Sequence, residues 1–162
     1  MVAQGTDDTA PAAQRAPGPA QPSIKARALR LLAGREHSRA ELERKLAPHE
    51  QTPGQLASAL DELQAKGFIN PQRVLESVVH RRSTRYGAAR IEHELVGKGL
   101  DPQAISEAMS ALQGSELERA RAIWVRKFRE PSQELKEQAR QMRFLMGRGF
   151  SSEIARKVTS GH

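Results

Sequence analysis

Signals that begin and end helices recur along nearly the whole chain. Capping boxes, in which Ser or Thr precedes Glu or Gln by three positions, and Asx-Pro pairs both put a capping side chain at a helix start. These starts lie at Ser38, Thr52, Ser115, Asn70-Pro71 and Asp101-Pro102. Glycines that end helices lie at Gly34, Gly67, Gly87, Gly99, Gly114 and Gly149. This punctuation indicates a chain built from short helices.

Large apolar residues between these signals are spaced three or four positions apart, which is the helical period. Ile24 and Ala28 begin the pattern, and Ile154 with Val158 closes it. The spacing predicts nine helices, the third over 53–66 and the fourth over 71–85. No segment alternates with the period of a strand, and aromatic residues make up only 4% of the chain. We therefore expect an all-α fold.

The nine helices fall into three similar groups. A shift of 49 positions places Leu42 on Ile91 and Leu46 on Leu95, and a further shift of 50 places Leu95 on Leu145. The repeat predicts three-helix units over 23–69, 70–114 and 115–162. A unit this small buries too little apolar surface to stand alone. We therefore expect three tandem three-helix repeats that pack on one another in an elongated, curved array.

Residues 1–22 differ in composition from the rest. They hold four of the nine prolines, and their only apolar side chains larger than alanine are Met1 and Val2. Such a segment cannot offset its ordering entropy by burial, so we predict a disordered tail over 1–22. No apolar run approaches the ~18 residues of a membrane span, and the N-terminus lacks the pattern of a secretory signal. We expect a cytoplasmic monomer.

Catalytic and metal-binding motifs are absent from the sequence. There is no cysteine, no Gly-rich phosphate loop, no GxSxG and no HExxH. The five histidines form no i,i+4 pair, and the carboxylates lie among basic residues at helical spacing, as solvated ion pairs do. We expect no enzymatic activity, no metal and no cofactor.

The net charge of +7 is concentrated in the third unit, which carries eleven basic and six acidic residues. The densest basic clusters are 81–85 (Arg-Arg-Ser-Thr-Arg) and 126–129 (Arg-Lys-Phe-Arg). Both lie at the end of the first helix of their unit, where cations complement the helix dipole. They are equally the groups that would face phosphates or an acidic protein groove. Both interpretations stay open at this point.

The aromatic residues are placed for a core more than for stacking on bases. Trp124, Phe128 and Phe144 fall at helical spacing with other apolar residues, and only Tyr86 is placed as an exposed stacking residue. A platform for single-stranded nucleic acid uses several such rings.

The first unit suggests an alternative function, a helix-turn-helix-like transcriptional regulator that binds DNA. The helix pair that begins at Ser38 and continues over 53–66 is similar to that of a winged-helix protein. However, Asn70-Pro71 begins a helix where a wing hairpin would lie, and 53–66 contains no arginine to read base edges. A helical scaffold for another protein is a third interpretation.

The order and spacing of several short motifs resemble the RecX family of bacterial recombination regulators. These motifs are 38–42 (Ser-Arg-Ala-Glu-Leu), 67–70 (Gly-Phe-Ile-Asn), 81–91 (Arg-Arg-Ser-Thr-Arg-Tyr-Gly-Ala-Ala-Arg-Ile), 98–100 (Lys-Gly-Leu) and 148–150 (Arg-Gly-Phe). The resemblance covers about 24–158. One departure stands at 70–75, where the family usually has an acidic pair followed by Arg-Phe-Ala. Here Arg73 is kept, the acids are missing and Val74 replaces the aromatic residue.

The resemblance implies three tandem three-helix repeats and a partner, the filament of the RecA recombinase. It implies that the chain lies along the filament groove and inhibits ATP hydrolysis, strand exchange and the coprotease role. Combined with the basic clusters, it yields a hypothetical binding surface, with weak non-specific contact to single- or double-stranded DNA. Its residues are Arg81, Arg82, Arg85, Tyr86, Arg90, Lys98, Arg140, Arg143 and Arg148.

Overall fold

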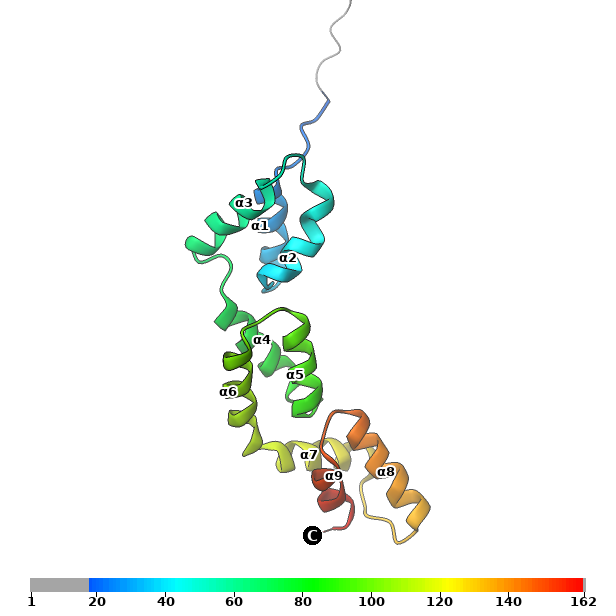
Figure 1. Ribbon diagram of the computed structural model, residues 1–162. Helices are drawn as coiled ribbons and strands as arrows, with labels where there is room; N and C mark the ends of the chain where they lie inside the picture. Colours follow the sequence, from blue (N-terminus) through cyan, green and yellow to red (C-terminus); the bar gives the residue numbers. More distant parts are fainter. Residues whose placement is uncertain (1–17, 162) are drawn as a thin grey trace, which may run out of the picture.

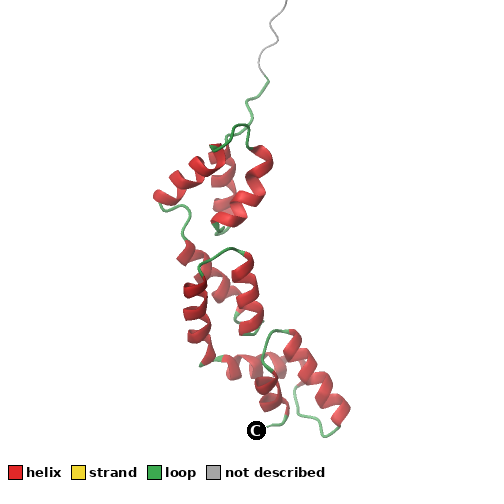
Figure 2. Ribbon diagram, in the orientation of Figure 1, coloured by secondary structure: helices red, strands yellow, loops and turns green. Residues whose placement is uncertain are grey.

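The computed structural model describes residues 18–161, and over that range it is a row of α-helices with no strand (Figures 1 and 2). Residues 1–17 of the predicted tail lie outside the described residues, and 18–22 are exposed and non-helical. No helix within the described range is long and apolar enough to cross a membrane. The helices are α1 (Ile24–Gly34), α2 (Arg39–Leu46), α3 (Gln55–Ala65), α4 (Pro71–Arg82), α5 (Ala88–Gly97), α6 (Pro102–Gln113), α7 (Glu116–Phe128), α8 (Leu135–Gly147) and α9 (Ser152–Thr159), with a 3-10 turn, η1 (Ala47–His49), after α2.

Four of the five predicted helix starts are confirmed, and three of them carry the predicted side-chain cap. Ser38 and Glu41 form a complete capping box, and the side chains of Asn70 and Asp101 accept from backbone amides in the first turns of α4 and α6. The prediction at Thr52 is wrong, because α3 begins at Gln55 after the left-handed Gly54 (φ 85°).

At Ser115 the helix start is confirmed, since α7 begins at Glu116, but the predicted capping box is absent. Its backbone (φ −106°, ψ −1°) is helical where a cap needs an extended residue, and its hydroxyl donates to the Leu112 carbonyl at 3.2 Å. The reason is that α6 runs almost directly into α7.

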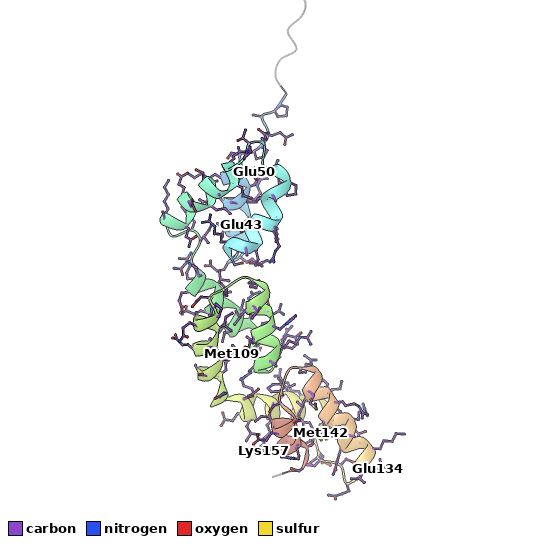
Figure 3. All side chains as sticks on the ribbon, in the orientation of Figure 1. Glu43, Glu50, Met109, Glu134, Met142 and Lys157 are labelled. Carbon is purple, nitrogen blue, oxygen red and sulfur yellow. The ribbon has the colours of Figure 1, made fainter. Side chains whose placement is uncertain are left out.

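The structure confirms the predicted repeat. Three separate apolar clusters form, one for each group of three helices, and they follow one another along a curved array (Figure 1). Leu46, Leu95 and Leu145, which the sequence shift superposes, are each buried in their own cluster. Met109 and Met142 pack against the second and third clusters (Figure 3). The array is therefore held by three small cores and by the joints between them.

One core position of the third repeat, on α8, is occupied by a polar residue. Gln141 stands where Ile91 and Leu42 stand in the other repeats, and it is 2% exposed. The indole Nε1 of Trp124 donates to its Oε1 at 2.9 Å, so the buried amide oxygen is satisfied.

The joint between the second and third repeats includes direct backbone hydrogen bonds. The Gly87 amide donates to the Arg148 carbonyl at 2.8 Å and the Ala89 amide to the Gly149 carbonyl at 3.2 Å. A Cβ at Gly87 would run into the Gly149 carbonyl, so only glycine allows this approach. The start of α5 and the α8–α9 turn are thereby fixed against each other.

The joint between the first and second repeats is made by side chains. Lys98 Nζ lies 2.7 Å from Glu41 Oε1, the Arg44 guanidinium donates to the Gly97 carbonyl at 3.2 Å, and Arg73 bridges to Glu36 at 2.9 Å. Among the described residues, no backbone–backbone hydrogen bond crosses this joint.

Candidate partner-binding surface

Tyr86 lies in the connection between α4 and α5, and arginines from two repeats lie around its ring. The guanidinium carbons of Arg90, Arg148 and Arg82 lie 4.4, 5.5 and 5.8 Å from the centre of its ring. Cations at these distances are attracted to the ring face. The ring is half-buried and covered by arginine, so it holds these cations in place and is not an open platform for a base.

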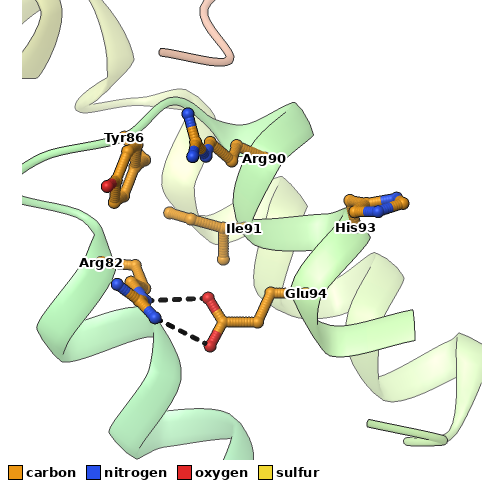
Figure 4. A pocket seen from close by; sticks show the side chains of 6 residues that line it. All are labelled: Arg82, Tyr86, Arg90, Ile91, His93 and Glu94. Atoms are coloured by element: carbon orange, nitrogen blue, oxygen red, sulfur yellow. Dashed lines mark hydrogen bonds and ion pairs between the residues drawn. The ribbon is translucent and has the colours of Figure 1, made fainter. Parts of the chain in front are cut away.

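Arg82 is the paired member of this group. Its Nε lies 2.8 Å from Glu94 Oε2, across a small pocket of about 170 Å³ that Ile91 and His93 also line (Figure 4). Arg90 points to the other side, where its Nη1 donates to the Gly147 carbonyl of the third repeat at 3.2 Å. The two arginines therefore help to tie α4, α5 and the α8–α9 turn together.

A second, larger hollow lies beside this cluster, where the α4–α5 turn meets α7 and α8. We call it the cationic groove. Its volume is about 350 Å³, and its lining residues are Thr84, Arg85, Ile123, Arg126, Lys127, Phe144 and Arg148. Four of these seven side chains are cations and none is an acid. The sequence spacing explains the arrangement, since 123, 126 and 127 share one face of α7, as 144 and 148 do on α8.

The cations of the groove are held by rings and carbonyls. Lys127 Nζ lies 4.4 Å and the Arg148 guanidinium 5.2 Å from the centre of the Phe144 ring. Arg126 Nη2 donates to the Thr84 carbonyl at 3.3 Å across the joint. Preorganised cations lose less side-chain entropy when they bind an anion.

Three predicted arginines lie outside both the Tyr86 cluster and the groove. Arg81 is exposed on α4, where its Nε donates to the Ser77 carbonyl of its own helix at 3.3 Å. Arg143 is exposed on α8, and Arg140 of the same helix pairs with Glu137 at 3.1 Å. The structure therefore brings together Arg82, Arg85, Tyr86, Arg90 and Arg148, and leaves Arg81, Arg140 and Arg143 outside this group as exposed cations.

Lys98 lies in the first joint, away from the other predicted residues. Its side chain is 11% exposed and faces Glu41, whose side chain is 10% exposed. Burial alone would raise the pKa of Glu41, but hydrogen bonds from Arg35, Lys98 and the Ser38 amide outweigh it and lower the pKa to about 2. The charge of Lys98 is thus neutralised within the array.

Sequence reasoning left three basic residues of this region out of the binding surface. Arg126 and Lys127 belong to a basic cluster that the sequence does display, but its convergence with 81–85 depends on the fold. Arg119 carries no such signal. It is half-buried, donates to the carbonyls of Ser83 at 3.0 Å and Tyr86 at 2.8 Å, and its burial lowers its pKa.

The first repeat shows a different electrostatic character. Asp61 of α3 pairs with Arg39 at 2.6 Å, and Glu62 pairs with Lys25 at 2.7 Å and Lys66 at 2.8 Å. A helix with acids on its exposed face is poorly suited to a major groove lined by phosphates. Within the described range, no group of His, Cys, Asp and Glu is arranged to hold a metal ion.

Fold and surface together define a class: an all-helical protein of three tandem three-helix repeats with a cationic groove at its second joint. Family models for the first, second and third three-helix domains of RecX match residues 25–63, 72–109 and 115–159 in that order. The chain belongs to the RecX family.

Close relatives extend over almost the whole chain. The regulatory protein RecX of Leptothrix cholodnii is 54% identical over 138 residues, which are 85% of this chain and 88% of the relative. That of Ralstonia nicotianae is 46% identical over 144 residues, 88% of this chain and 91% of the relative. The crystal structure of RecX from Lactobacillus salivarius has the same fold, with a TM-score of 0.70 at 20% identity over 85% of this chain and 93% of that one.

Proposed function

We propose that this chain regulates the RecA recombinase by binding its filament and inhibiting ATP hydrolysis, strand exchange and the coprotease activity. The observation that carries the proposal is the family match, which runs through all three repeats in order and covers nearly the full length of the relatives. An elongated array suits a partner that is itself elongated, because successive repeats can contact successive subunits.

The binding surface of this proposal consists of the exposed cations of the second and third repeats. Arg81, Arg85 and Arg143 are exposed, and the arginines around Tyr86 add to them. A single exposed ion pair contributes less than ~1 kcal/mol, so affinity comes from many contacts along the array. The chain acts as a monomer in the cytoplasm without a cofactor, and the same cations make weak, non-specific contact with DNA phosphates.

The test is ATP hydrolysis by RecA of the same organism on single-stranded DNA, titrated with this protein. We expect hydrolysis to fall at ratios far below one copy per RecA monomer. A triple charge reversal, Arg81→Glu with Arg85→Glu and Arg143→Glu, should weaken the effect at least tenfold while the circular dichroism spectrum stays helical.

Reversal of Arg27 and Arg30 on α1 serves as the control, since it changes charge in the first repeat only. Unchanged hydrolysis with a folded wild-type protein would contradict the proposal. Selection of duplex sites would then test the transcriptional alternative.

A further inference from the structure

The cationic groove concentrates positive charge without a counter-ion. Arg85, Arg126, Lys127 and Arg148 line one hollow of about 350 Å³, and no carboxylate lines it. The acids near this joint are already engaged, since Glu94 pairs with Arg82 and Glu116 accepts from the Ala88 amide at 3.4 Å. Four cations that repel one another in a shared hollow favour a ligand that brings negative charge.

The groove also has an apolar part. Ile123 is 7% exposed and belongs to the third core, and Phe144 packs edge-on against Phe128 with ring centres 5.3 Å apart. Both side chains line the hollow, so an apolar side chain seated in it would contact Ile123 and the part of Phe144 that its stacked cations leave exposed. The groove is therefore lined both by cations and by apolar side chains.

The aromatic rings at this joint are not open to a nucleobase. Lys127 and Arg148 are stacked against Phe144, and Arg90 is stacked against Tyr86. A base that stacked there would have to displace a cation that the phosphates need. A nucleic acid strand would thus use the cations alone, whereas a peptide with carboxylates and an apolar side chain would use both parts of the groove.

We infer that the cationic groove binds an acidic segment of a partner protein, in which carboxylates flank an apolar side chain. The carboxylates pair with Arg85, Arg126 and Lys127, and the apolar side chain contacts Ile123 and Phe144. This inference deepens the proposed function and rests on it in one respect only, the identity of the protein that carries the acidic segment. The groove's chemistry stands independently of that identity.

The test is binding of a dye-labelled octapeptide, two central leucines flanked by glutamates, to the full chain by fluorescence anisotropy. The groove variant is Arg126→Gln with Lys127→Gln. The control variant, Arg27→Gln with Arg30→Gln, removes the same charge from the first repeat. We expect the groove variant to weaken binding at least tenfold and the control to stay within twofold of wild type. Replacement of both leucines by serine should weaken binding about fivefold.

Two results would overturn the inference. One is equal peptide binding by wild type and groove variant, with both folded by circular dichroism. The other is a wild-type protein that binds an oligothymidylate but not the peptide, together with a groove variant that no longer binds the oligothymidylate. This result would assign the groove to nucleic acid. The RecA assay separates the two proposals. Peptide binding without an effect on ATP hydrolysis supports the inference about the groove and contradicts the proposed function. An effect on ATP hydrolysis without peptide binding contradicts only the inference about the groove.

Discussion

Replacement of Glu41 by glutamine tests how the first two repeats are joined. The Glu41 carboxylate lies in the first turn of α2 and accepts from Lys98 Nζ at 2.7 Å, the Ser38 amide at 2.8 Å and Arg35 Nη2 at 3.1 Å. Glutamine keeps an acceptor for the Ser38 amide, so the capping box persists. The substitution therefore removes the charge and leaves the buried ammonium of Lys98 without its partner.

The magnitude follows from the pKa of Glu41, which falls from its ordinary value of 4.5 to about 2 in the folded protein. This difference corresponds to about 3 kcal/mol of stability. The unfolded chain takes up its proton near pH 4.5 and the folded protein only near pH 2. The stabilisation is thus present above pH 4.5 and is lost as the pH falls toward 2.

The assay is urea unfolding followed by circular dichroism at pH 7 and pH 3. We expect Glu41→Gln to lose about 2–3 kcal/mol at pH 7. At pH 3 about half of that difference should remain. Addition of Lys98→Met should recover part of the loss, because no buried charge then stands alone. A variant as stable as wild type at pH 7, or a gap that does not narrow at pH 3, would refute the reasoning.

Three further predictions follow from the second joint, the third core and the exposed cations. Gly87→Ala forces a Cβ against the Gly149 carbonyl and should cost ~1–3 kcal/mol of stability in thermal unfolding. Gly97→Ala places its Cβ in open space and should not destabilise the protein, so equal melting temperatures of the two variants would contradict the tight approach at Gly87. Gln141→Met leaves the Trp124 indole without its acceptor and should cost ~1–3 kcal/mol in unfolding monitored by tryptophan fluorescence; an unchanged midpoint would show that the bond contributes nothing. Added salt should weaken inhibition of RecA in the ATPase titration, because it screens exposed cations; a titration indifferent to salt would exclude an electrostatic surface.

The fold was predictable because its signals are local. Apolar spacing and side-chain caps act within one helix, and the shift that relates Leu46 to Leu95 and Leu145 reflects three cores built alike. The failures at Thr52 and Ser115 have different causes. The third helix begins only after Gly54, so Thr52 does not stand at the capping position. Ser115 stands at that position, but its backbone is not extended, because the path of the chain between α6 and α7 keeps it helical.

The candidate site was predictable only in part, because its residues come from different repeats. The clusters at 81–85 and 126–129 stand out in the sequence, but only the joint brings Arg85 beside Arg126 and Lys127. Lys98 shows the opposite case. In the sequence Lys98 looks like one more surface cation, but its side chain is largely buried where the second repeat packs against Glu41 of the first. Whether these cations bind a partner stays a prediction.

Because the two joints are built differently, the array does not resist bending equally at both. Amide–carbonyl bonds between Gly87, Ala89 and the α8–α9 turn are neutral, so ionic strength barely affects them, whereas the first joint depends on charge pairs such as that of Arg73 with Glu36, which salt weakens. As salt rises, the exposed pair of Arg73 with Glu36 should therefore weaken before the backbone bonds of the second joint do, and the first repeat should gain freedom to move before the third.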